Sequence, residues 1–389
     1  MIGFFVISTQ LGGAEQSLLD YFRHTERDRG GLLVILPKNE GPLIEELKKL
    51  NIKTKTLPMP EFLFSQSRQN SFLFSLSFPL LSLFAFWHII KVSKLIKSKK
   101  LQLIHTTGIK YHLFVSLAVI LFGGPKVVLH IRDLINGWFL RKLFNQLGSH
   151  SKITLVANSK ISAQTLNPSV PVIYNGFDDS KFHPSPSSKL KEQIGIDSNM
   201  TLVTLVGVIA RWKGQREFLN AAQRVLETQS NVHFLIVGDQ IYDTKGDQGE
   251  LTQLKALASH PSLKKHIHFL PFQQNISSIY QGTDILVHNS IHPEPFGRVI
   301  VEGLLCGCQV SAANEGGPLE IFNSPTEGLH HNPRDPEDLA KNLRILLQSP
   351  EKSQQMAKRG HRRALQFTMN EYVHNLDRLL NSSHSEPRY

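Results

Sequence analysis

The sequence contains little cysteine and, in its first half, few acidic residues. Its two cysteines, Cys306 and Cys308, are one residue apart, a spacing that disfavours a disulfide between them. No other cysteine occurs among the 389 residues, which excludes the disulfide framework of small secreted domains. Residues 1–7 are apolar but too short, and wrongly flanked, for a signal peptide, and they are typical of a buried first strand. We therefore expect a cytoplasmic protein.

Acidic residues are missing altogether between Glu61 and Asp133. Residues 1–170 carry a net charge of +12 and the remainder carries −1, so the first half holds the whole excess of +11. A basic region of this size attracts polyanions, which include membrane surfaces, nucleic acids and acidic substrates. Only the charge favours a nucleic-acid partner. The sequence has no interleaved aromatic platform and no known nucleic-acid-binding module. We expect no nucleic-acid partner.

An apolar run, residues 72–90, lacks charged side chains and leads into a cluster of five lysines: Lys91, Lys94, Lys97, Lys99 and Lys100. Three interpretations stay open: a buried helix of an α/β domain, an amphipathic helix lying on a bilayer, and a membrane-spanning helix. Pro79, His88 and three serines argue against the last. We hypothesise that residues 72–100 bind an anionic membrane surface, because lysines beside aromatic residues suit that environment. The protein would then sit peripherally on the inner face of the membrane.

Short apolar segments alternate with helix-length segments along the chain, a pattern typical of parallel sheets covered by helices. The predicted strands form two series, 2–8, 32–36, 101–105, 126–131 and 153–157, then 201–208, 232–237, 266–270, 284–288 and 308–312. A segment rich in Pro, Ser and Asn, 168–199, separates the series. We predict an α/β fold with two Rossmann-like parallel-sheet domains, 1–180 and 190–364, facing across a cleft. A helix near 365–380 is expected to pack back on the first domain, and the tail 381–389 is expected to be disordered.

The segment 289–303 combines a loop carboxylate with a predicted helix start. Glu294 follows a strand, and a helix is expected to begin near 295–297, where proline is well tolerated. Backbone N–H groups at such a helix start can bind a diphosphate, and they belong to Phe296, Gly297 and Arg298. Glu294 could accept hydrogen bonds from sugar hydroxyls, and Glu302 could bind a ribose diol. By itself the segment is also compatible with a helix-start acid followed by a solvated glutamate.

The order of several motifs resembles the GT4 family of glycosyltransferases. Glu294-x7-Glu302, with Pro-Phe-Gly after the first Glu, resembles the family's E-x7-E signature, and 304–320 resembles the run that follows it. Three earlier segments resemble the family's GGAE loop, its interdomain segment and its phosphate loop: 10–15, 175–184 and 207–214. The resemblance implies a GT-B fold and a retaining glycosyltransferase that uses a nucleotide-sugar donor, with UDP or GDP expected, and no metal or other cofactor. It also implies that the first domain binds the acceptor and the second the donor.

The resemblance implies roles for individual residues. Lys213 would neutralise the diphosphate leaving group, with Arg211 as a second cation, because Val208 stands where the family has arginine. His130 would contact the donor sugar together with Glu294. Backbone near the donor would come from Gly13 and Gly238 as well as the helix start, and the acceptor side would be lined by Gly12, His105 and Thr106.

The sequence says least about the acceptor, because the first domain, which would bind it, has the fewest recognisable motifs. The basic, apolar 72–100 region favours a lipid-linked or membrane-presented sugar acceptor, as in polysaccharide or glycolipid assembly. Two other classes stay open: a nucleotide-sugar epimerase or phosphorylase of the same architecture, and a non-catalytic protein that binds a polyanion or membrane. The sequence has no Asp-x-Asp motif at a strand end and no Cys/His cluster with ligand spacing, so we predict no metal site.

Overall fold

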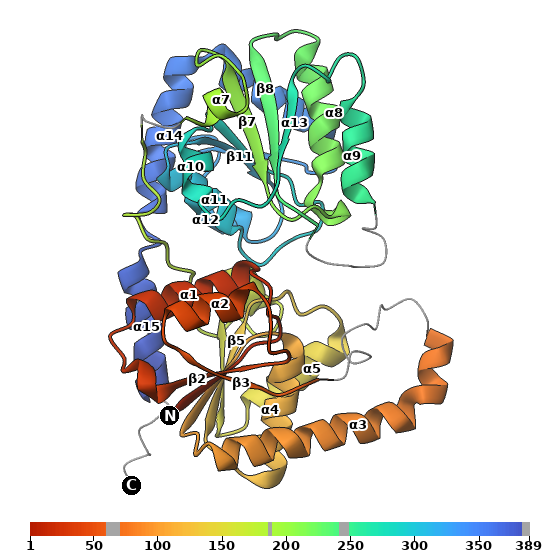
Figure 1. The fold of residues 1–389 in the computed structure, drawn as a ribbon, viewed down its shortest axis with the longest axis vertical. Helices are drawn as coiled ribbons and strands as arrows, with labels where there is room; N and C mark the ends of the chain where they lie inside the picture. The colour runs from red at the N-terminus through yellow and green to blue at the C-terminus, as the bar shows by residue number, and fades with distance from the viewer. Residues whose placement is uncertain (60–70, 186–188, 241–248, 383–389) are drawn as a thin grey trace. The chain divides into compact units, whose positions relative to one another are not determined.

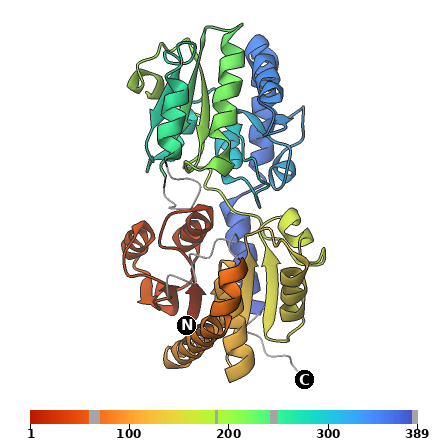
Figure 2. The same ribbon diagram turned by 90° about the vertical axis from the view of Figure 1, so that its right-hand side faces the viewer.

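The computed structural model describes residues 1–59, 71–185, 189–240 and 249–382. The chain divides into two compact units. Unit 1 contains Met1–Gly176 and the chain from Met369 onward, and unit 2 contains Phe177–Thr368. Each unit has one six-stranded parallel sheet with helices on both faces (Figures 1 and 2), which confirms the predicted α/β class. Beyond Ser382, the predicted tail lies outside the described residues.

The sheet of unit 1 has the strand order β3-β2-β1-β4-β5-β6, and all of its strands are parallel. Its strands are β1 (Ile2–Phe5), β2 (Leu32–Leu36), β3 (Lys53–Thr56), β4 (Leu103–Thr106), β5 (Lys126–Ile131) and β6 (Ile153–Ala157). Its helices are α1 (Gly13–His24), α2 (Pro42–Lys49), α3 (Ser71–Ser98), α4 (Ile109–Phe122), α5 (Trp138–Gly148), α6 (Lys160–Gln164) and α15 (Met369–Ser382). A sheet buried on both faces requires nearly continuous apolar strands, and β1 and β2 are buried at every position.

Alternate strand residues of unit 1 point to opposite faces and build two separate cores. Phe4 and Val34 belong to the core beneath α1, α2 and α15. Phe5 and Ile35 belong to the core beneath α3, α4 and α5. Helix α15, which comes from the end of the chain, contributes Tyr372 to the first core and so ties the C-terminus to unit 1.

Helix α3, drawn in orange in Figure 1, has a buried part and an exposed part. From His88 to Ile96 it packs on the core of unit 1 beside α4. From Leu83 to Trp87 most of its large apolar side chains are exposed. Among the described residues, no helix is long and apolar enough to cross a membrane.

The sheet of unit 2 has the strand order β12-β11-β10-β7-β8-β9, again all parallel. Its strands are β7 (Thr201–Val206), β8 (Val232–Val237), β9 (Ile267–Leu270), β10 (Ile285–His288), β11 (Gln309–Ala313) and β12 (Leu329–His331). Its helices are α7 (Leu190–Gln193), α8 (Gln215–Leu226), α9 (Glu250–Ala258), α10 (Ile276–Gln281), α11 (Arg298–Leu305), α12 (Pro318–Ile321), α13 (Pro336–Gln348) and α14 (Pro350–Ala364). Helices α8, α9 and α13 enclose one core, while α10, α11 and α14 pack together. Both cysteines are buried, and both are free, as their spacing predicted.

The strands differ from the sequence prediction mainly at β3, β12 and β1. The edge strands β3 and β12 were not predicted, and β1 ends at Phe5 instead of residue 8. Strand β3 reads Lys-Thr-Lys-Thr and is largely exposed, so it lacks the apolar signal on which the prediction depended. Strand β12 has only three residues.

Candidate active site

The strand order reverses once in each sheet. In unit 1 the reversal lies between β1 and β4, and in unit 2 it lies between β7 and β10. Ligands of open α/β sheets bind outside the carboxyl ends of the strands at such a reversal. Residues predicted for the site follow or end these strands: Gly12 and Gly13 after β1, His105 and Thr106 in β4, Arg211 and Lys213 after β7, and Glu294 after β10.

The loop after β7 presents Lys213 at the end of a short 3-10 helix, Arg211–Lys213. Gly214 ends this turn with φ 70° and starts α8. A side chain there is excluded, because an added Cβ would lie 2.1 Å from the backbone oxygen of Asn289. The close approach of Gly214 to Asn289 thus fixes the loop after β7 against the loop after β10.

The carboxylate of Glu294 meets the ammonium group of Lys213. Lys213 Nζ donates to Glu294 Oε2 at 2.6 Å and to Ser290 Oγ at 3.2 Å. His288, the last residue of β10, contacts the other carboxylate oxygen. Burial would raise the pKa of Glu294, but the charges of Lys213 and His288 outweigh it and hold that pKa well below its usual range. Glu294 is therefore ionised at neutral pH.

The predicted helix start is the start of α11. Gly297 is its N-cap with φ 106°, and Phe296 is buried between Phe177 and Phe367, with ring centroids 6.2 and 5.6 Å away. The packing of Phe296 fixes the backbone just before the helix. The positive end of the α11 dipole thus lies in the same loop as Glu294, where it favours negative charge.

Three other predicted residues already have protein partners. Arg298 Nη2 lies 3.2 Å from Glu302 Oε1, four residues later on α11. Glu302 also accepts a 2.9 Å hydrogen bond from the hydroxyl of buried Tyr280. Arg211 pairs with Glu217 at 3.0 Å, in the first turn of α8. A ligand that uses Glu302 or Arg211 would compete with these contacts.

Gly238 follows β8 in a conformation open only to glycine, with φ 146°. An added Cβ would lie 1.9 Å from the backbone oxygen of Gly207, which follows the neighbouring strand β7. Gly238 therefore lets the loops after β7 and β8 meet backbone to backbone.

In unit 1 the structure brings the predicted histidines together. His105 Nε2 and His130 Nδ1 lie 3.1 Å apart on neighbouring strands, and His112 of α4 lies 2.6 Å from the hydroxyl of Thr106. Burial, with a smaller contribution from the charge of Arg132, lowers the pKa of His105 to about 3 and that of His130 well below its usual value. Both rings are neutral. Within the described chain, Nε2 of His130 is buried without a hydrogen-bond partner.

The glycine loop after β1 leads into α1. Gly12 is the N-cap, in extended backbone, and Gly13 is the first helical residue. Asn175, at the end of unit 1, accepts hydrogen bonds from Ser17 of α1 at 3.1 Å and from Arg132 after β5 at 2.6 Å. These bonds connect the glycine loop with the strand that carries His130.

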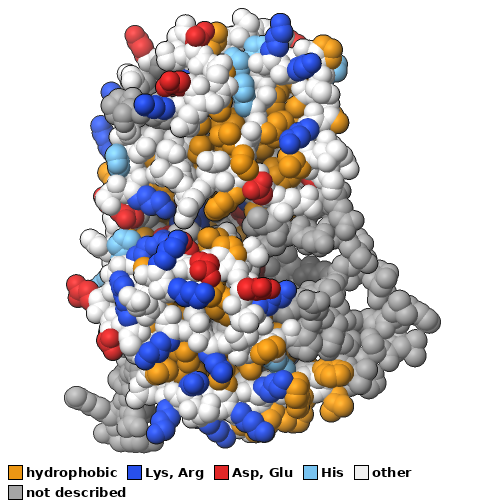
Figure 3. Space-filling view, viewed as in Figure 1, with side chains coloured by type: hydrophobic (Ala, Val, Ile, Leu, Met, Phe, Trp, Pro, Cys, Tyr) orange, Lys and Arg blue, Asp and Glu red, His pale blue; other side chains and the backbone are white. Residues whose placement is uncertain are grey.

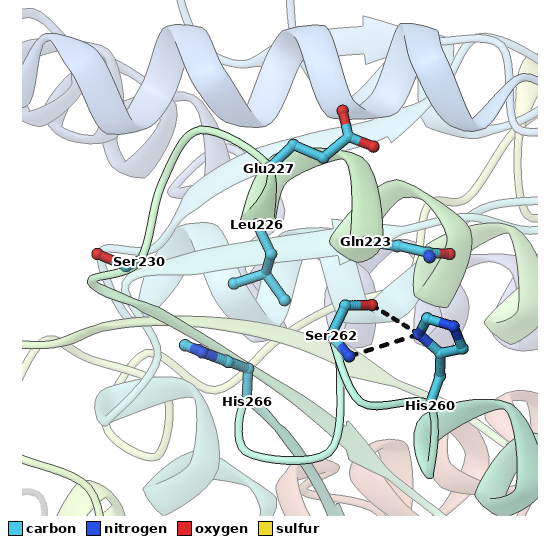
Figure 4. A pocket seen from close by; sticks show the side chains of 7 residues that line it. All are labelled: Gln223, Leu226, Glu227, Ser230, His260, Ser262 and His266. Atoms are coloured by element: carbon cyan, nitrogen blue, oxygen red, sulfur yellow. Dashed lines mark hydrogen bonds between the residues drawn. The ribbon is translucent and has the colours of Figure 1, made fainter.

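A surface pocket of about 260 Å³ lies elsewhere in unit 2 (Figure 4). It is lined by Gln223, Leu226, Glu227, Ser230, His260, Ser262 and His266. Ser230 and His266 precede β8 and β9, so the pocket is at the amino ends of those strands, opposite the edge where ligands of such sheets bind. None of the predicted site residues lines it. Across the described ranges, no group of three or more His, Cys, Asp or Glu side chains could hold a metal ion.

Several residues of this arrangement were not predicted from the sequence. His288 and Ser290 contact the Lys213–Glu294 pair, Tyr280 holds Glu302, and His112 holds Thr106. Only His288 and Ser290 had a usable signal, because they end or directly follow the predicted strand before Glu294.

Comparison with known proteins supports the motif-based resemblance. The structure is similar to that of Anabaena HepE in complex with UDP, with a TM-score of 0.80 and 25% identity over 98% of this chain and 99% of that chain. The sequence model of the family described as glycosyl transferases group 1 matches residues 186–363, which include Lys213 and Glu294. The matched residues, 186–363, are thus similar to this family, also called GT4. The chain is a glycosyltransferase of class EC 2.4 with the predicted GT-B fold.

Sequence relatives of this glycosyltransferase cover less of the chain. Spore coat protein SA of Bacillus subtilis is 23% identical over 62% of this chain and 70% of its own length. D-inositol 3-phosphate glycosyltransferase of Rhodococcus opacus is 29% identical over 55% of this chain. The chain spans about half of that relative's length, 47%.

Proposed function

We propose that this glycosyltransferase transfers a sugar, with retention of anomeric configuration, from a UDP-sugar to an acceptor presented at a membrane. The observation that carries the proposal is the Lys213–Glu294 pair, 2.6 Å apart at the strand-order reversal of unit 2. The likeness to HepE, also solved with UDP-glucose, covers 98% of this chain and favours UDP over GDP.

Departure of the diphosphate is the step that the unit 2 residues would assist. Charge builds on the leaving phosphate, and a preorganised cation lowers the barrier without further reorganisation. Lys213 is preorganised by Glu294 and Ser290, and the start of α11 adds the positive end of its dipole. These groups supply the charge that a metal ion supplies in other enzymes, so we propose that transfer needs no metal.

Glu294 would have a second role. Its ionised carboxylate can accept hydrogen bonds from donor-sugar hydroxyls while it holds Lys213. In unit 1, the buried and unpartnered Nε2 of His130 suits a polar contact with the sugar. Gly12, Gly13, His105 and Thr106 remain our candidates for the surroundings of the reacting carbon and the acceptor.

A surface on α3 and α4 supports the membrane-presented acceptor. Leu83 and Trp87 of α3 are 64% and 51% exposed, and Leu121 of α4 is 54% exposed. Phe86 and Phe122 connect the two helices, with ring centroids 6.3 Å apart. Figure 3 shows apolar and basic side chains beside one another over these helices. Exposed lysines follow on the same helix or just after it: Lys94, Lys97, Lys99 and Lys100.

The donor half of the proposal is tested by a screen of UDP-, GDP- and ADP-sugars for thermal stabilisation and slow hydrolysis, with Glu294→Ala in parallel. We expect stabilisation by UDP-sugars and hydrolysis that disappears in the variant. Chelation of metals by EDTA should leave the rate unchanged. An altered but uncleaved nucleotide sugar would indicate an epimerase and refute transfer.

The membrane half is tested by flotation with phosphatidylglycerol vesicles at low salt. Binding should fall at least tenfold in Lys94→Glu/Lys97→Glu, because each basic residue near anionic lipid contributes about 1 kcal/mol. The matched control is Lys264→Glu/Lys265→Glu, which changes two exposed lysines of unit 2. Equal loss in both variants, or no binding by the wild type, would refute a specific α3–α4 surface.

A further inference from the structure

The loop between β7 and α8, residues 207–214, carries Lys213 and is called the Lys213 loop below. A line of buried side chains crosses unit 2 and ends at this loop. Asn342 of α13 donates to Ser311 of β11 at 3.3 Å, and Ser311 lies 2.9 Å from His331 of β12. His331 lies 2.7 Å from Asn289, and Asn289 donates to the backbone oxygen of Gly214 at 2.9 Å. All four side chains are buried, and the line ends next to Lys213.

The direction of every hydrogen bond in this line is determined. The Gly214 carbonyl can only accept, so the Asn289 amide nitrogen donates and its oxygen must accept from His331 Nε2. Burial lowers the pKa of His331 to about 3, so the ring is neutral and its Nδ1 accepts from the Ser311 hydroxyl. The Ser311 oxygen is then left to accept from Asn342. No partner in the line is mismatched.

Asn289 holds both loops of the candidate site. Its side chain bonds the Gly214 carbonyl, which also accepts from Phe218 in the first turn of α8. Ile291, two residues after Asn289, donates its N–H to the Trp212 carbonyl at 2.8 Å. A rotation of the Asn289 amide would release Gly214 and loosen the loop after β7 from the loop that carries Glu294.

We propose that His331 is a positioning residue: through Asn289 it fixes the Lys213 loop in the geometry that meets the donor diphosphate. His331 itself does not touch substrate. The proposal rests on the proposed function for the identity of the ligand, but the fixing of the loop is a property of the free protein. Outer hydrogen-bond partners of metal ligands typically change affinity or activity by about 10-fold or more, and we expect an effect of the same order here.

The first test needs no ligand. Hydrogen–deuterium exchange of residues 207–218 is compared between wild type, His331→Phe and the milder Ser311→Ala. The matched control is His330→Phe, on the same strand, whose ring stacks on Phe322 at 4.3 Å and is not in the line. We expect exchange about 10-fold faster in His331→Phe and in Ser311→Ala, and unchanged exchange in the control. Unchanged exchange in Ser311→Ala and His331→Phe would overturn the proposal.

The second test uses UDP and a double-mutant cycle. UDP should bind about 10-fold more weakly to His331→Phe, and this loss should vanish when Asn289→Ala is already present, because the effect passes through Asn289. Additive losses of UDP affinity would show that His331 acts only on general stability, and they would overturn its positioning role through Asn289. If wild type does not bind UDP while the exchange result holds, the proposed donor fails and the positioning role stands.

Discussion

Replacement of Lys213 by methionine removes a cation while keeping a side chain of similar length. Lys213 and Glu294 are only 15% and 13% exposed, so water replaces little of the lost contact. Removal of one preorganised cation that contacts a developing anion lowers kcat by about 100-fold or more. This loss corresponds to an increase of about 2.7 kcal/mol in the activation free energy. We expect that loss in Lys213→Met, and the same order of loss in Glu294→Ala, where the cation loses its partner.

Stability should fall less than activity in these variants. Loss of one partner from a fully buried pair costs about 3–5 kcal/mol. Here His288 and Ser290 still contact the Glu294 carboxylate, so we expect a loss on the order of 1–2 kcal/mol in Lys213→Met.

The assay is turnover of UDP-glucose at saturating donor, beside urea unfolding of the same preparations. Lys264→Met serves as a control for removal of an exposed cation from unit 2. Wild-type kcat in Lys213→Met, with normal folding, would refute the assignment of the leaving-group charge to this residue.

Three further predictions follow from the geometry. Gly238→Ala should destabilise the protein by more than 2 kcal/mol in urea unfolding, because its Cβ would meet a backbone oxygen at 1.9 Å. Gly249→Ala, where φ is 75° and nothing lies within 4 Å of the added Cβ, should cost about 1 kcal/mol. Glu302→Gln should raise the donor KM about 10-fold with kcat nearly unchanged if Glu302 binds the ribose; a kcat loss with constant KM would contradict that role. Burial lowers the pKa of three histidines to about 3: His105, His112 and His331. In the unfolded state the histidine pKa is near 6.5, so below that pH the unfolded state binds more protons than the folded state. As the pH is lowered below about 6.5, the unfolding free energy should therefore decrease by up to about 1.4 kcal/mol per pH unit for each histidine. Equal unfolding free energies at pH 7.5 and pH 5.5 would contradict this.

The central strands were predictable from the sequence because burial on both faces makes them continuous apolar runs. β2, β5, β6 and β8 have the predicted bounds, and the other predicted strands are displaced by one to three residues at an end. Two of the four edge strands, β3 and β12, were missed because they lack such a run. β3 is largely exposed and pairs with β2, and β12 has only three residues and pairs with β11. A pairing partner distant in sequence leaves no local pattern.

The same distinction applies to the site. Lys213 and Glu294 belong to loops after neighbouring strands, so motif order and sheet topology together place them near each other. The pairing of Arg298 with Glu302 could be read from their four-residue spacing on a helix. The contacts of His331 with Asn289 could not, because they join residues 42 positions apart through a strand that the sequence did not reveal.

The most direct test of the account is a crystal structure of the protein with UDP. We expect diphosphate oxygens within hydrogen-bonding distance of Lys213 Nζ and the start of α11, with Glu294 next to the terminal phosphate. UDP bound at another place in unit 2, such as the pocket between α8 and His266, would contradict it.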